Sequence, residues 1–185
     1  MARLYDYVLR SQGLSRQRFA TEFPTPFLCV RAEHAGENAQ WSFKTETVSS
    51  FGYEMVEKLE ERGLTLSPEI AKYEVFPVEK TPGNPWPERI SVGRARNSDI
   101  VLPHSSVSKL HAHFVYNPEG KLTLVDAGSR NGTLVDKNRL VAGTPEPVEA
   151  GARITFGAIT LNYLTPEELF ELVERHVQPK TGTGG

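Results

Sequence analysis

The sequence lacks the features that mark a disulfide-bonded, secreted or membrane-spanning protein. Cys29 is the only cysteine among 185 residues, so no intrachain disulfide can form and a cluster of thiolate metal ligands is excluded. No apolar run approaches the roughly 20 residues that a membrane-spanning helix needs. The first six residues also lack the apolar core of a secretion signal. We therefore expect a soluble cytoplasmic protein that does not bind membranes.

A strong charge of either sign is also missing. The chain has 21 Lys and Arg against 23 Asp and Glu, and its formal net charge of −2 gives no overall attraction to nucleic acid. The distribution is uneven, because residues 88–140 hold eight basic and five acidic side chains. A basic segment in an otherwise acidic chain favours a small acidic ligand over a long polyanion.

The hydrophobic pattern changes near residue 66. Residues 1–66 mix helical and strand patterns: Ser15 caps a short helix, residues 53–62 favour a second helix, and residues 41–48 favour a hairpin with residues 26–33. We expect this region to be a mixed α/β unit of unknown role.

Residues 67–164 instead favour serial short strands separated by turn residues, which is typical of a β-sandwich. The predicted strands cover residues 73–79, 89–92, 100–102, 111–116, 122–126, 133–135, 153–156 and 159–164. A capping box at Thr165 and Glu168 opens a helix predicted over 165–178, and residues 179–185 are predicted to be a flexible tail.

Loops between the predicted strands carry side chains that suit one bound anion. The guanidinium of Arg94 matches two phosphate oxygens at once, while Ser108 adds a hydroxyl donor and Lys109 a mobile charge. Asn131 can both donate to and accept from an extended peptide backbone. The Asn131-Gly132 pair is also a strong hairpin signal. Glycines in these loops, Gly93 among them, permit tight turns and close approach.

The same loops offer weaker catalytic and metal-binding interpretations. His104, His111 and His113 lack a carboxylate or thiol that completes a zinc site. Ser108, His111 and Asp126 have the residue types of a hydrolase triad, but nothing resembles a nucleophile elbow. We predict no catalytic residues, no metal site and no cofactor, and hence that the chain is not an enzyme.

At these residues the sequence resembles the forkhead-associated (FHA) domain. The resemblance covers about residues 72–164 and rests on an ordered set of segments, Gly93-Arg94, residues 97–102, 107–112, 126–133 and 151–157. It implies a mainly β fold, an FHA-like eleven-stranded β-sandwich, to which this chain adds the N-terminal α/β region and the C-terminal helix. It also implies phosphothreonine-dependent binding of a partner in Ser/Thr kinase signalling.

The resemblance assigns roles to single residues. It implies that Arg94 and Ser108 contact the phosphate, that Asn131 holds the peptide main chain, and that Lys109 and Arg130 lie near the ligand. The family commonly has arginine where this chain has Lys109, so the charge is kept but the planar fork is lost.

The supporting residues are Gly93, His111 and Gly132, with the imidazole bracing the loop that carries Ser108.

The expected partner is a phosphothreonine-containing protein or peptide, either a Ser/Thr kinase or its substrate, bound by a monomer. A phosphate-independent scaffold that uses the sandwich face or residues 1–66 is the alternative. A further hypothesis is that phosphorylated Thr45 or Thr47 occupies the chain's own site, although an ordinary strand edge is the simpler interpretation.

Overall fold

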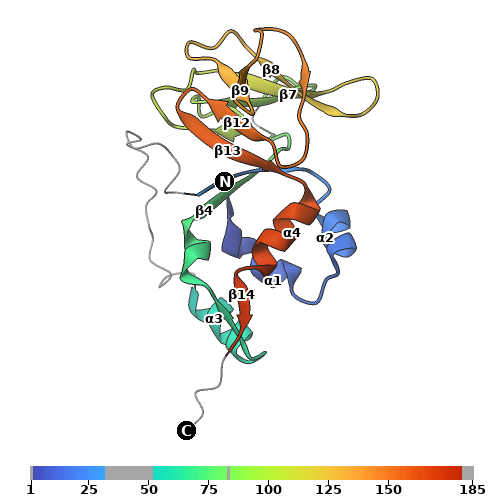
Figure 1. Ribbon diagram of the computed structural model, residues 1–185, viewed down its shortest axis with the longest axis vertical. Coiled ribbons are helices and arrows are strands. Elements are labelled where there is room, and N and C mark those ends of the chain that lie inside the picture. Colours follow the sequence, from blue (N-terminus) through green and yellow to red (C-terminus); the bar gives the residue numbers. More distant parts are fainter. Residues whose placement is uncertain (1, 32–51, 83, 181–185) are drawn as a thin grey trace.

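Two β-sheets stack against each other at one end of the molecule, and helices gather at the other end (Figure 1). The structure is a computed structural model that describes residues 2–31, 52–82 and 84–180. Residues 41–48, and with them Thr45 and Thr47, lie outside the described residues. No helix in the described ranges is long and apolar enough to cross a membrane.

The larger sheet has seven strands and the smaller has five. The larger sheet has the order β1 (Ala2–Arg3), β4 (Tyr73–Pro77), β2 (Phe27–Arg31), β13 (Ile159–Leu164), β12 (Arg153–Phe156), β9 (Thr133–Val135) and β10 (Asn138–Arg139). The smaller sheet has the order β11 (Glu146–Pro147), β8 (Leu122–Asp126), β7 (Ala112–Tyr116), β5 (Ile90–Gly93) and β6 (Ile100–Val101). Only the pairing of β5 with β6 is parallel among these strands.

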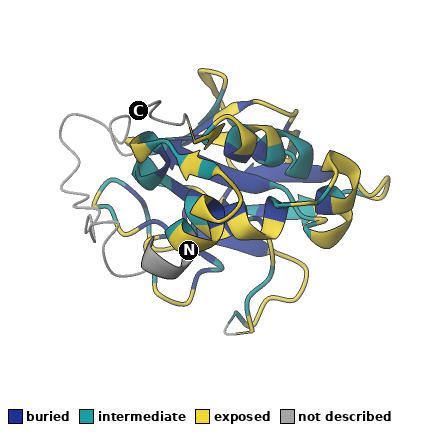
Figure 2. Cartoon of the chain, turned by 90° about the horizontal axis from the view of Figure 1, so that it is seen from below, coloured by how far each residue is buried: buried dark blue, intermediate teal, exposed yellow. Residues whose placement is uncertain are grey.

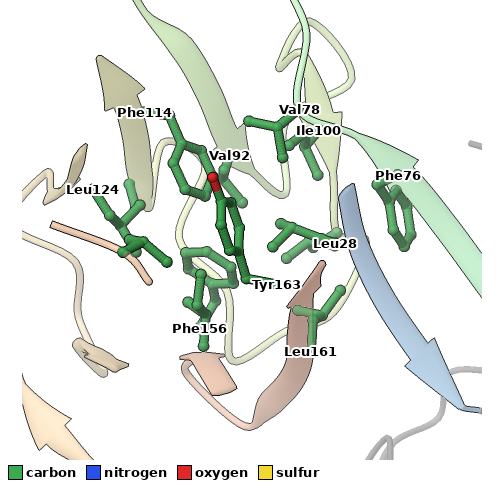
Figure 3. Packing of buried hydrophobic residues seen from close by; sticks show 14 of the residues in the cluster. Leu28, Phe76, Val78, Val92, Ile100, Phe114, Leu124, Phe156, Leu161 and Tyr163 are labelled. Atoms are coloured by element: carbon green, nitrogen blue, oxygen red, sulfur yellow. The ribbon is translucent and has the colours of Figure 1, made fainter. Parts of the chain in front are cut away.

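The two sheets share one hydrophobic core. Leu28 and Leu161 from the larger sheet face Val92, Phe114 and other residues of the smaller sheet, as Figure 3 shows. The two sheets together hold twelve strands, which is close to the eleven expected. The predicted mainly β, FHA-like sandwich is therefore confirmed.

A second core joins the larger sheet to the helices. Residues alternate along β2, so Leu28 and Val30 enter the sandwich core while Phe27 and Cys29 enter this second core. Burial on both faces explains why the strand reads as a continuous apolar run, and Figure 2 shows buried strands beneath helices whose outer surfaces are exposed.

The helical part contains η1 (Leu4–Tyr7), α1 (Val8–Ser11), α2 (Arg16–Glu22), α3 (Gly52–Glu60), η3 (Pro68–Lys72) and α4 (Pro166–Glu174). Ser15 caps α2 by accepting from the Arg18 N–H, and the capping box of Thr165 and Glu168 opens α4, both as predicted. The ring of Tyr7 in η1 packs edge-on against the ring of Phe19 in α2, with centroids 6.4 Å apart.

Helix α4 is shorter than the sequence predicted. It ends at Glu174, and Val177–Pro179 forms strand β14, which pairs with β3 (Leu64–Leu66). The Lys180 N–H then donates to the Gly63 carbonyl oxygen, so the predicted flexible tail begins too early. The interaction that decides this is a strand pairing across more than 100 residues, which a local pattern does not contain.

Two other expectations need comment. The Asn131-Gly132 pair does not form a hairpin, because β8 belongs to the five-stranded sheet and β9 to the seven-stranded sheet. The division of the chain near residue 66 stays a prediction, but one strand that precedes it, β2, lies inside the larger sheet between β4 and β13.

Candidate functional site

Loops at one end of the sandwich are tied to one another by hydrogen bonds. They are the β5–β6 loop (residues 94–99), the β6–β7 loop (102–111), the β8–β9 loop (127–132) and the β12–β13 turn (157–158). Helix α4 starts after the opposite end of β13, which has six residues and so spans about 20 Å. The helical part therefore lies away from these loops.

Arg94 follows β5 and is fixed by the neighbouring β6–β7 loop. Its N–H donates to the Ser108 carbonyl oxygen (2.9 Å) and its Nε donates to the Val107 carbonyl oxygen (3.1 Å). The side chain is exposed, and its two terminal guanidinium nitrogens have no hydrogen-bond partner among the described residues. The two terminal guanidinium nitrogens of Arg94 are thus left to donate hydrogen bonds to a ligand.

Gly93 makes this approach possible. A Cβ atom at this position would overlap the carbonyl oxygen and carbon of Lys109, which belong to rigid backbone. The adjoining Ala95 N–H donates to the same Lys109 oxygen at 3.1 Å. Any larger residue at position 93 would therefore push the two loops apart.

His111 braces the loop that carries Ser108. The ring is fully buried, its Nδ1 accepts the Ser108 N–H (3.0 Å), and its Nε2 lies 3.0 Å from the Gly132 carbonyl oxygen. An acceptor at one nitrogen and a donor at the other require the neutral imidazole with hydrogen on Nε2. Burial lowers the pKa of His111, which keeps this neutral form near pH 7.

The Ser108 hydroxyl is positioned by the β8–β9 loop. Its Oγ accepts the Arg130 N–H at 3.1 Å, which leaves the hydroxyl hydrogen to donate elsewhere. The side chains of Lys109 and Arg130 are exposed and form no hydrogen bond or ion pair within the described ranges. Three cationic residues, Arg94, Lys109 and Arg130, therefore lie on the loops that meet at this hydroxyl.

Asn131 presents an acceptor at the same end. Its Nδ2 donates to the Ser106 carbonyl oxygen (2.7 Å), whereas its Oδ1 has no hydrogen-bond partner in the part of the chain that the structure describes. The side chain is exposed. Ser106 uses only one N–H of the amide, so the second N–H and Oδ1 are left for the contact with a peptide backbone that the sequence suggested.

Asp126, the last residue of β8, fixes the β8–β9 loop by hydrogen bonds. One carboxylate oxygen accepts the N–H groups of Gly128 and Ser129 (both 2.9 Å), and the other accepts the hydroxyls of Ser129 (2.7 Å) and Thr133 (2.6 Å). Burial opposes ionisation of Asp126, but these hydrogen bonds outweigh it and lower its pKa. Gly132 completes the loop with a φ of 81°, and a Cβ there would overlap the Arg139 guanidinium.

These contacts show that Ser108, His111 and Asp126 form no proton relay. Both ring nitrogens of His111 face backbone groups, and Asp126 bonds within its own loop. Across the described ranges, no group of three or more His, Cys, Asp or Glu residues is arranged to hold a metal ion.

Two residues of the site were not identified from the sequence. Ser106 joins three loops: its carbonyl binds Asn131, and its Oγ accepts the Ala158 N–H (2.9 Å) and lies 2.7 Å from His104 Nδ1. Arg139 donates from Nη1 to the Asn131 carbonyl oxygen (3.2 Å) and adds a further exposed cation. Neither residue stands in a local pattern that would distinguish it from an ordinary surface residue.

Asp99 was read only as part of the resemblance, yet it anchors the β5–β6 loop. Its carboxylate has no exposed surface and accepts the N–H groups of Thr81 (2.8 Å) and Ser91 (2.7 Å), with Lys80 Nζ at 3.2 Å. Burial alone would raise the pKa of Asp99, but the hydrogen bonds from Thr81 and Ser91 lower it to about 2. The loop that carries Arg94 is thus fixed at both ends.

All five predicted ligand residues and all three predicted supports therefore lie around the same connected loops. Their contact with a phosphopeptide stays a prediction.

Comparisons with known proteins agree on the identity of this region. The sequence pattern of the FHA domain matches residues 90–157. A protein phosphatase 1 regulatory inhibitor subunit homologue of Arabidopsis thaliana is 42% identical over 66 residues, which are 36% of this chain and 18% of that protein. An oxoglutarate dehydrogenase inhibitor of Corynebacterium glutamicum is 38% identical over 74 residues, which are 40% of this chain and 49% of that protein. The chain thus spans less than half the length of these two relatives.

Among solved structures, the N-terminal FHA domain of Rad53p from S. cerevisiae, in complex with a phosphothreonine peptide, is 22% identical, with a TM-score of 0.40 over 46% of this chain and 73% of that chain. The FHA domain of a Chlamydia trachomatis protein is 20% identical, with a TM-score of 0.42 over 55% and 93% of the two chains. The family match covers the strands and loops that carry Arg94, Ser108, His111 and Asn131. Residues 90–157 of this chain therefore belong to the FHA domain family.

Proposed function

We propose that this FHA domain binds a phosphothreonine-containing segment of a partner protein and that the chain acts by binding, without catalysis. The observation that carries the proposal is the direct contact between Arg94 and Ser108. The backbone hydrogen bond between them is 2.9 Å long, and each presents an unused donor at the loop end of the sandwich. An arginine fork and a hydroxyl are the donors that a phosphate monoester requires.

The binding mechanism follows from the donors and acceptors left over. Arg94 donates two hydrogen bonds to phosphate oxygens, the Ser108 hydroxyl donates a third, and Lys109 and Arg130 add positive charge. Asn131 accepts a peptide N–H through Oδ1 and donates its second amide N–H to a peptide carbonyl, because the Ser106 carbonyl uses only the first. The peptide main chain is thereby aligned beside the phosphate.

The rigidity of the loops adds to affinity. Because Arg94, Ser108 and the β8–β9 loop are already fixed by internal hydrogen bonds, less ordering is needed when the ligand binds. Each charge-assisted hydrogen bond adds about 1.5–3 kcal/mol. After the cost of association, a few such bonds give a Kd near the micromolar range, or about −8 kcal/mol, which suits reversible signalling.

The partner in this proposal is a Ser/Thr kinase or one of its substrates, in the cytoplasm. Two relatives that share this domain are inhibitors by name, one of protein phosphatase 1 and one of oxoglutarate dehydrogenase. Binding another protein is a sufficient basis for inhibition, which agrees with a module that recognises and does not react.

Fluorescence anisotropy with matched degenerate peptide pools tests the proposal. The pools carry phosphothreonine, phosphoserine or unmodified threonine, and we expect the full chain to bind the phosphothreonine pool most tightly. Arg94→Ala should weaken that binding at least tenfold, or by more than 1.4 kcal/mol. Arg96→Ala is the matched control, because Arg96 is an exposed arginine of the same loop that the proposal does not use.

Two results would contradict the proposal. Equal affinity for the three pools would remove phosphothreonine recognition. Partner binding that Arg94→Ala leaves unchanged would favour the phosphate-independent scaffold. Thermal unfolding of both variants separates a loss of binding from a loss of structure.

A further inference from the structure

A groove of about 720 Å³ lies on the outer face of the five-stranded sheet. Its floor is formed by His113 and Val115 of β7 and by Val125 of β8. These side chains point away from the sandwich, because their neighbours Phe114 and Leu124 point into its core. The groove is therefore separate from the core and from the helical part.

Loops form the two walls of the groove. The β10–β11 loop contributes Ala142 and Pro145 and is held over the end of β8 by the Gly143 N–H, which donates to the Asp126 carbonyl oxygen (2.9 Å). The opposite wall contains residues 88–89 and Leu110. The groove is thus open to solvent, with a hydrogen-bonded loop on one side and the sheet as its floor.

The lining is mainly apolar, with six such side chains: Leu110, Val115, Val125, Ala127, Ala142 and Pro145. Asp126 at the end of β8 also borders the groove, but its carboxylate points to the opposite face, where it bonds to the β8–β9 loop and to Thr133. Glu88 and Arg89, at the rim of the groove, carry opposite charges that offset each other. The groove thus favours an uncharged, apolar ligand segment over a charged one.

Exposed apolar surface gathers around the same groove. Leu110 in its wall is 48% exposed, and Val141, next to Ala142, is 67% exposed. Trp86 is 62% exposed, and its ring centroid lies 5.9 Å from the guanidinium carbon of Arg89 at the rim. Such a concentration of exposed large apolar side chains is typical of a binding surface.

The groove is continuous with the candidate phosphate site. Leu110 follows Ser108 by two residues, and Gly128 precedes Arg130 by two residues. Two extended residues span about 7 Å, so a peptide held at its phosphate reaches the groove within two or three residues. From Leu110 to Val115 the groove can follow an extended segment of about five residues.

We propose that this groove binds apolar side chains of the same partner segment that carries the phosphothreonine, on one flank of the phosphorylated residue. This inference rests on the proposed function and extends it, since it gives the domain a second contact. The phosphate would supply recognition of the modified state, and the apolar flank would supply selection among phosphorylated partners.

The test uses the full chain and phosphothreonine peptide libraries randomised on both flanks. We expect enrichment of large apolar residues at positions between two and six residues from the phosphothreonine, on one side only. Ala142→Arg places a long charged side chain in the groove and should weaken binding of the enriched peptide about tenfold. Its binding of a phosphothreonine peptide with only glycine and alanine flanks should change less than twofold.

Thr144→Arg is the matched control, because Thr144 is an exposed residue of the same loop and does not line the groove. It should bind both peptides like the unmodified chain. Thermal unfolding confirms that both variants are folded.

Three outcomes would overturn the inference. They are the absence of apolar enrichment on either flank, an equal loss of enriched-peptide binding in both variants, and a dimer of the free chain that Ala142→Arg abolishes in sedimentation velocity. The last result would assign the groove to a second copy of this chain. Failure of the proposed function is distinguishable, because then even the peptide with glycine and alanine flanks would bind no better than its unphosphorylated form.

Discussion

Replacement of His111 by phenylalanine tests how the binding loops are held in place. Phenylalanine keeps a planar ring and an edge-on contact with Phe156, whose ring centroid lies 5.7 Å from that of His111, and it is slightly larger. It removes both imidazole hydrogen bonds, so the Ser108 N–H and the Gly132 carbonyl oxygen lose their partner. The change therefore removes the hydrogen bonds while an aromatic ring stays in the core.

The expected cost can be worked from these two groups. A buried polar group that loses its partner costs about 1–3 kcal/mol. Gly132 is buried, whereas Ser108 is only partly buried and can recover a hydrogen bond to water. We therefore expect a loss of about 2–4 kcal/mol in the free energy of unfolding, together with weaker binding of phosphothreonine peptides because the Ser108 loop is released.

His113→Phe is the control for this experiment. His113 lies two residues further along the chain, points out of the sandwich, and its buried Nδ1 has no hydrogen-bond partner among the described residues. Its replacement should change stability by less than about 0.5 kcal/mol or stabilise the chain, because no hydrogen bond is lost. Urea unfolding at pH 7.5 measures both variants. Equal stability of the two variants would refute the bracing role of His111.

The pH dependence supplies a second readout of the same brace. Because burial lowers the pKa of His111, the unfolded chain takes up a proton below about pH 6.5 that the folded chain does not. The stability that His111 contributes should therefore be fully present above that pH and decrease as pH falls. The difference in unfolding free energy between the unmodified chain and His111→Phe should shrink in parallel, and a difference that grew towards low pH would contradict the assigned tautomer.

Three further predictions concern single residues. Gly93→Ala should weaken phosphothreonine-peptide binding at least tenfold, because its Cβ overlaps the Lys109 carbonyl. Gly128→Ala has open space around its Cβ and should cost only about 1 kcal/mol of stability. Anisotropy and urea unfolding compare the two variants, and equal peptide binding by both would contradict the clash. Asp99 should add about 2 kcal/mol to the free energy of unfolding above pH 4, because its pKa is lowered to about 2. This contribution should be lost between pH 4 and 2. The unfolding free energy of Asp99→Asn should therefore fall less steeply with pH in this range, and an unchanged slope would contradict the assignment. Lys109→Arg should tighten phosphothreonine binding by less than tenfold, since it restores a planar fork near the phosphate. Titration calorimetry measures the change, and unchanged binding would place Lys109 away from the ligand.

Much of the sandwich could be predicted from the sequence. The bounds of β8, β9, β12 and β13 agree with the predicted strands, because alternating apolar residues and turn residues delimit them. The capping box of α4 is also local, since Thr165 and Glu168 satisfy each other's backbone groups.

The rest depends on contacts that are distant in the chain. Strands β10 and β11 have two residues each, too few to show an alternating pattern. The end of α4 is set by the pairing of β14 with β3. The Asn131-Gly132 pair has the left-handed glycine of a tight turn, but it links two different sheets, and strand order is not visible in a local signal.

The candidate site also contains residues that the sequence identifies and residues that only the folded structure reveals. Arg94, Ser108 and Asn131 could be identified because their order and spacing resemble a known family. Ser106 holds Asn131 through its backbone carbonyl, and its Oγ bonds to Ala158, which is distant in the chain; neither contact can be read from the residue type. The use of one Asn131 N–H by that carbonyl is not visible in the sequence for the same reason.

The central claim is that separate loops converge on one phosphorylated threonine. Titration of ¹⁵N-labelled full chain with a phosphothreonine peptide, followed by ¹H–¹⁵N correlation spectra, tests it residue by residue. We predict that the largest shifts fall on the backbone amides of Arg94, Ser108, Arg130 and Asn131, and that the unphosphorylated peptide leaves them unchanged. Shifts that are confined to other parts of the chain, or that are the same for both peptides, would contradict the account.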